Sequence, residues 1–150
     1  MWQAYLGFAT AVALVGWAIL IFLPRRPFLL SLVLYAGVGV LSLTYVLGLV
    51  SVLTGLADPG GPYTSAVSFF TVEGLRAIST NDAGVVIGWI HYLAFDLFIG
   101  LWIARDADAK GFSRTIQGIV LLLVLLAGLS GLLLWLILRE RAARRAARKP

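Results

Sequence analysis

The 150-residue chain has no cysteine, a single histidine and few charged residues, which make up only 13% of the sequence. Without cysteine it can form no disulfide and no thiolate metal site, and it has no cysteine nucleophile. Its seven Asp and Glu residues are dispersed along the chain, so they form no evident ligand set with the one histidine. We therefore expect neither a metal site nor a bound cofactor.

Apolar residues dominate the composition instead. They make up 61% of the chain and give a mean hydropathy of +0.97, whereas soluble domains are about 45–50% apolar and about 25% charged. No stretch offers the polar face that would cover so large a core in water. The composition predicts an integral membrane protein with one compact transmembrane domain over residues 1–138.

The formal charge of +5 comes largely from the end of the chain. Residues 139–150 hold half of the twelve Lys and Arg residues and directly follow an apolar run. A basic tail in this position is typical of the cytoplasmic side of a membrane, where it attracts anionic lipid. We therefore expect a basic cytoplasmic tail and membrane lipid as a partner, and no binding of nucleic acid.

Four apolar runs are long enough to cross the hydrocarbon core, which requires about 20 helical residues. They cover residues 2–23, 28–53, 84–104 and 115–138. The first run lacks the basic start and the cleavage site of a signal peptide, so we expect it to be retained as a span. The predicted fold is all-α, a polytopic four-helix transmembrane bundle.

Between the second and third runs the pattern changes. Residues 58–62 are rich in proline and glycine and form a turn or loop. The half-apolar stretch 63–79 is too short and too polar for an ordinary span, and its Glu73 and Arg76 would share one helical face. This pattern favours an interfacial or re-entrant helix that caps a cavity. A solvated connecting helix, or a fifth span, are the alternatives.

Four spans place both chain ends on one side of the membrane, and the basic tail puts that side in the cytoplasm. The charge bias that supports this orientation is small, with seven basic residues inside and five outside. Five spans would place the N-terminus outside instead. Reporter fusions at the two ends distinguish these topologies.

The third run carries both the only histidine, His91, and the acidic residue Asp96. A charged group near the bilayer centre costs roughly 2.5–3.5 kcal/mol on insertion scales, so such residues usually have a function. At 100° per helical residue the two lie on stripes about 140° apart, and each is expected to face a different neighbour. One stripe contains His91, Phe95, Phe98 and Trp102, and the other contains Trp89, Tyr92, Asp96, Gly100 and Ile103.

The block from Gly88 to Gly100, GWIHYLAFDLFIG, together with residues 102–106 and 128–134, resembles the abscisic-acid-deficient-four-like family of small membrane proteins. The resemblance covers most of the chain and the order of its spans. The chain departs from the family pattern at Leu101 and at Leu129–Ser130. Because Ser130 replaces a helix-breaking proline, we expect the last span to be a regular helix. The basic tail and the lack of a transit peptide are typical of a bacterial inner-membrane member.

The resemblance implies a carotenoid-modifying isomerase or a partner of such an enzyme. A plant member of the family takes part in making neoxanthin from violaxanthin, a carotenoid isomerisation that opens an epoxide and forms an allene. That reaction needs an acid and a base, for which His91 and Asp96 are the candidates. The expected substrate contacts are the aromatic side chains of the third run and the polar pair before it: Trp89, Tyr92, Phe95, Phe98, Trp102, Glu73 and Arg76.

Two other functions are compatible with the sequence. A non-catalytic scaffold or binder of a pigment, quinone or lipid needs the same apolar site without acid–base chemistry. A small proton-coupled transporter also uses a central carboxylate, although the first span here has no charge. In each case a second copy of the chain, in a homo-oligomer, can complete the site.

Overall fold

The computed structural model describes residues 1–61 and 70–146, and all of its regular structure is helical. Three helices are long and apolar enough to cross a membrane: Trp2–Phe22, Pro27–Leu53 and Asp82–Ala109. They coincide with the first three predicted spans. The all-α fold is therefore confirmed, and these helices indicate an integral membrane protein.

A short connection with a proline on each side joins the first two long helices. Helix α1 (Trp2–Phe22) ends before Pro24, and Pro27 occupies the first turn of the next helix, where a missing N–H does no harm. That second helix is continuous but changes geometry along its length. It begins as α2 (Pro27–Leu32), continues as a π-helix, η1 (Val33–Gly39), and ends as α3 (Val40–Leu53).

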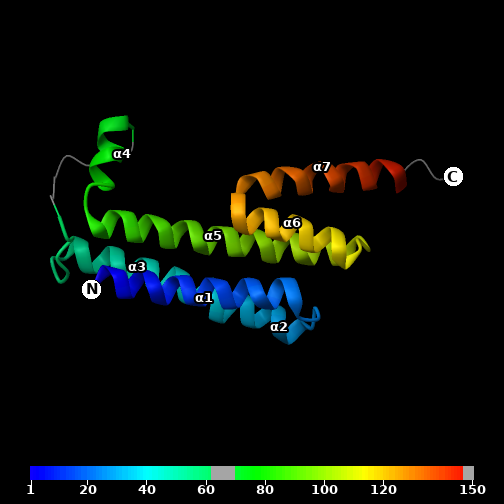
Figure 1. Cartoon of the computed structure of the whole chain (residues 1–150), viewed down its shortest axis with the longest axis horizontal. Coiled ribbons are helices and arrows are strands. Elements are labelled where there is room, and N and C mark those ends of the chain that lie inside the picture. Colours follow the sequence, from blue (N-terminus) through cyan, green and yellow to red (C-terminus); the bar gives the residue numbers. More distant parts are fainter. Residues whose placement is uncertain (62–69, 147–150) are drawn as a thin grey trace.

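Helix α5 (Asp82–Ala109) lies beside α1 and α3 at the centre of the bundle (Figure 1). Small residues permit the close approach of these helices. A Cβ on Gly100 of α5 would lie 2.5 Å from the Trp17 ring of α1, and one on Gly16 would lie 2.7 Å from Leu97. Both the Trp17 and the Leu97 side chains are almost fully buried there.

The connection between α3 and α5 contains one short described helix, α4 (Val72–Ile78), which projects from the bundle next to the start of α5 (Figure 1). The Thr71 hydroxyl caps it by accepting a hydrogen bond of 3.1 Å from the Gly74 amide. Residues 62–69 of the predicted helix 63–79 lie outside the described residues. Whether this stretch lies on the membrane or re-enters it stays a prediction.

The fourth predicted span is not one helix. The run 115–138 is divided into α6 (Arg114–Ala127) and α7 (Leu129–Ala146), which fold back on each other as a hairpin (Figure 1). Gly128 forms the turn with a φ of 47° and a ψ of −109°, a conformation that glycine adopts because it has no Cβ. The expectation of a regular last helix was therefore wrong, because Gly128 breaks the helix without a proline.

The hairpin changes the predicted topology. Met1 and the end of α7 lie at opposite ends of the bundle (Figure 1). The side of the membrane on which each chain end lies stays a prediction. At the end that we call the basic end, the turns after α1 and α5 meet, and Arg114 donates a hydrogen bond of 2.8 Å to the Leu23 carbonyl. At the other end, the Trp2 indole donates to the Asp58 carbonyl at 2.8 Å.

Candidate functional site

Asp96 lies near the middle of α5 and is 6% exposed. Its Oδ2 atom is buried and has no hydrogen-bond partner among the described residues. A buried polar atom without a partner costs free energy, and a carboxyl group at hydrocarbon depth costs more. A purely structural helix would avoid this cost with an apolar side chain, so Asp96 remains the first candidate for a functional group.

The turn of the α6–α7 hairpin lies directly against this carboxyl group. A Cβ on Gly128 would be 3.3 Å from each carboxyl oxygen of Asp96 and 3.2 Å from the Tyr92 hydroxyl. Helix α7 therefore begins next to Asp96, within the depth that α5 crosses. The first amides of a helix lack intrahelical partners and carry a partial positive charge, which complements a carboxylate.

Tyr92 lies one turn before Asp96 on the same side of α5, and its hydroxyl and the Asp96 carboxyl group both border Gly128. The Tyr92 ring also stacks on Trp89, with ring centroids 5.2 Å apart. Both rings are exposed, Trp89 to 50% and Tyr92 to 37%. The carboxyl group thus borders an exposed aromatic surface, which we call the Trp89–Tyr92 surface.

His91 faces another part of the bundle. Its imidazole is exposed and lies 4.6 Å from the Phe95 ring and 5.6 Å from the Tyr45 ring of α3, measured between centroids. Asp96 instead faces the hairpin turn. The structure therefore places the two residues against different neighbours, as their positions around the helix predicted, and does not bring them together.

The other predicted contact residues are divided among three places. Phe95 and Phe98 are exposed on α5, on the side of His91. Trp102 lies near the basic end, where the Arg139 guanidinium is 5.6 Å from its ring centroid. Glu73 and Arg76 are exposed on α4, at the opposite end from Trp102. The structure does not gather these residues into one site.

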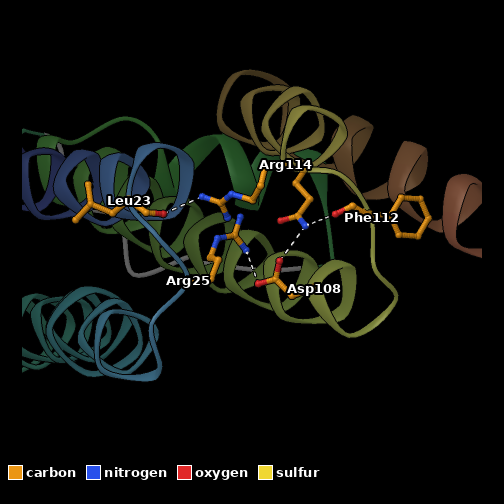
Figure 2. Close-up of polar contacts among 6 residues, drawn as sticks. Leu23, Arg25, Asp108, Phe112 and Arg114 are labelled. Carbon is orange, nitrogen blue, oxygen red and sulfur yellow. Dashed lines mark hydrogen bonds and ion pairs between the residues drawn. The ribbon is translucent and has the colours of Figure 1, made fainter.

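Sequence reasoning missed a polar cluster at the basic end (Figure 2). Asp108 accepts hydrogen bonds from Arg25 at 3.4 Å and from Gln117 at 2.9 Å, and Gln117 also donates to the Phe112 carbonyl at 2.9 Å. Gln117 is only 1% exposed. A glutamine within an apolar run was the available signal, and its role is to fix the start of α6 against α5.

No group of three or more His, Cys, Asp or Glu side chains converges within the described part of the chain. The arrangement around Asp96 offers a carboxyl group, a phenol and an apolar aromatic surface. These groups can exchange a proton with an apolar molecule on that surface.

The comparisons identify one family. A family model described as ABA DEFICIENT 4-like matches residues 5–135. No curated protein and no solved structure matches the chain.

Proposed function

The chain belongs to the ABA DEFICIENT 4-like family, and from this premise we propose that it acts on a polyene or similar lipid-like molecule within the membrane. The proposed reaction is an isomerisation of a carotenoid, with Asp96 as the proton-transferring residue. The observation that supports it best is the buried and unpartnered Oδ2 atom of Asp96 beside an exposed aromatic surface.

The geometry favours Tyr92 as the second proton-transferring group. A flat polyene on the Trp89–Tyr92 surface would pass next to the Tyr92 hydroxyl and the Asp96 carboxyl group, which are close neighbours. Asp96 would take a proton from a polyene carbon while Tyr92 donates one to the epoxide oxygen. The C–O bond of the epoxide opens, a hydroxyl and an allene form, and the proton on Asp96 returns to Tyr92, so no atom is gained or lost.

His91 stays a second candidate for the acid. Its imidazole lies beside Phe95 and Tyr45, so it would serve a substrate that approaches α5 from the side of α3. Tyr92→Phe and His91→Ala therefore distinguish two poses of the same substrate. The pose on the Trp89–Tyr92 surface predicts a loss of product only in Tyr92→Phe.

Expression in a host that produces epoxy-carotenoids, followed by pigment chromatography, tests the proposal. We expect an isomerised pigment with the wild-type chain and at least a 100-fold loss in Asp96→Asn, in line with the contribution of general acid–base catalysis. Glu140→Gln is the matched control, because this exposed carboxyl group pairs with Arg144 and, within the described part of the chain, with no other side chain. Identical pigments from wild type, Asp96→Asn and the empty host would refute catalysis.

Binding without catalysis is the second candidate function. It is favoured by the openness of the Trp89–Tyr92 surface, since both rings are exposed rather than enclosed with Asp96. A pigment that copurifies unchanged with wild type, and equally with Asp96→Asn, would support this function in place of the isomerisation.

A further inference from the structure

A second apolar site lies outside the Trp89–Tyr92 surface, between α1 and the helix segment formed by α2 and η1. It is a groove of about 330 Å³ whose lining is almost entirely apolar. Phe8, Val15 and Ile19 form one wall, and Leu32, Val33 and Ala36 form the other. Gly16 and Gly37 lie between the walls, and both pack against Leu97 of α5, which lies beneath them.

The groove coincides with the π-helical segment. Val33, Ala36 and Gly37 belong to η1, the only π-helix in residues 1–61 and 70–146. A π-helical turn is rare and is retained most often at functional sites, since its hydrogen bonding is poorer than that of an α-helix. Here the π-helical segment forms most of one wall of the groove.

The length of the groove along α1 matches the thickness of one leaflet of a bilayer. Its α1 wall extends from Phe8 to Ile19, about 16 Å at 1.5 Å per residue. One leaflet of hydrocarbon is about 15 Å thick, half of the whole core. Ile19 lies one turn from the end of α1, so the groove begins close to the basic end and extends past the middle of α1 to Phe8.

Two arginines lie in the connection that follows the groove at the basic end. Arg25 and Arg26 lie in the short connection between α1 and α2, which joins the two walls. Arg114 lies nearby on α6, and Asp108 is the acidic partner that Arg25 contacts. Arg26 is exposed and makes no ion pair with any described residue.

Arg25, Arg26 and Arg114 carry more positive charge than the single carboxylate of Asp108 neutralises. Burial lowers the pKa of the Arg25 guanidinium, and the charge of Arg114 acts in the same direction, while Asp108 opposes both. The Arg25 side chain is 9% exposed, and its Nε atom has no hydrogen-bond partner among the residues that the structure describes. An anion at this position would relieve the repulsion between the guanidinium groups.

We propose that the groove is a binding site for one anionic phospholipid, with an acyl chain between α1 and the α2–η1 segment and its phosphate beside Arg25 and Arg26. A phospholipid combines the two features that the site needs, an apolar chain one leaflet long and a negative group at its end. The site is independent of Asp96 and of any reaction there.

Native mass spectrometry of the purified full-length chain tests this proposal. The protein is released from detergent with phosphatidylglycerol or phosphatidylcholine of identical acyl chains, and the retained lipid is counted. We expect one retained phosphatidylglycerol and weaker retention of phosphatidylcholine. Arg26→Gln should reduce the preference for phosphatidylglycerol about fivefold, the effect of one basic residue near a membrane surface.

Ala11→Leu tests the groove itself, because Ala11 lines it on α1 and a larger side chain would fill it. We expect this variant to lose both lipids. Ala18→Leu is the matched control, since Ala18 is exposed on the same helix but does not line the groove. Thermal unfolding of each variant without added lipid excludes a general folding defect.

Three outcomes would overturn the proposal. Equal retention of the two lipids by wild type would remove the role of the cations. Unchanged retention in Ala11→Leu would remove the groove. Binding of soluble glycerol phosphate as tight as that of the whole lipid would show an anion site without an acyl chain. Arg25 is not used in the test, because its contact with Asp108 also supports the fold.

Discussion

Gly128 of the hairpin turn faces the Asp96 carboxyl group across the α5–hairpin interface. A Cβ on Gly128 would lie 3.3 Å from both carboxyl oxygens, a tight contact that the absence of a side chain at the turn avoids. The same glycine provides the positive φ that reverses the chain. One residue therefore determines both the shape of the hairpin and the surroundings of the carboxyl group.

Gly128→Ala should destabilise the protein by about 1–3 kcal/mol, because alanine is strained at this φ and ψ and its methyl group would crowd Tyr92 and Asp96. Chemical unfolding in a mild detergent measures the change. Gly118→Ala in the preceding helix α6 is the control, since a Cβ there meets nothing within 4 Å. It should be neutral or stabilising by up to about 1 kcal/mol. Equal effects of the two variants would contradict the role of the turn.

Asp96→Leu should raise the unfolding midpoint and abolish any activity. The substitution removes a buried carboxyl atom that lacks a partner, and a carboxylate at this depth costs roughly 2.5–3.5 kcal/mol on insertion scales. Such an opposition between stability and activity is typical of functional residues. Thermal unfolding and the pigment assay measure the two effects. A large destabilisation would show that Asp96 has a structural role instead.

The sequence was sufficient for the three long helices, because length and uniform hydropathy determine a span almost independently of tertiary contacts. It was insufficient for the hairpin. Residues 115–138 are as apolar and as long as a span, and a single glycine in such a run is usually tolerated within a helix. The opposed directions of His91 and Asp96 followed from helical periodicity. The contact of Asp96 with Gly128 depends on a tertiary fold that periodicity cannot supply.

One signal of the hairpin was present in the charges. A continuous fourth span left five basic residues on the outside, which the charge rule disfavours. With the hairpin, the chain returns to the basic end, so the residues after α5 and those after α7 lie at the same end. That end carries eight of the nine basic residues whose side chains are described: Arg25, Arg26, Arg105, Lys110, Arg114, Arg139, Arg141 and Arg144. Arg76 lies at the opposite end.

Gly100→Leu should disrupt the α1–α5 interface. A Cβ on Gly100 would already lie 2.5 Å from the Trp17 ring, and Trp17 is almost fully buried, so the ring has no space into which it can move. Overpacking of this kind costs about 1–3 kcal/mol and sometimes more. Gly88→Leu lies on the same helix with nothing within 4 Å of its Cβ and should have little effect. Comparable unfolding midpoints for the two variants would show that α1 and α5 do not pack as described.

The two chain ends should lie on opposite sides of the membrane, with the N-terminus outside and the end of α7 in the cytoplasm. If α1, α2–α3 and α5 each cross the membrane once, the chain after α5 lies on the side opposite the N-terminus. The α6–α7 hairpin starts and ends at the basic end, so it does not change that side. The concentration of Lys and Arg at that end orients it toward the cytoplasm. Fusions of a periplasm-active and a cytoplasm-active reporter at Met1 and after Lys149 measure this directly. Opposite signals are expected, and identical signals at both ends would require the α6–α7 segment to cross completely.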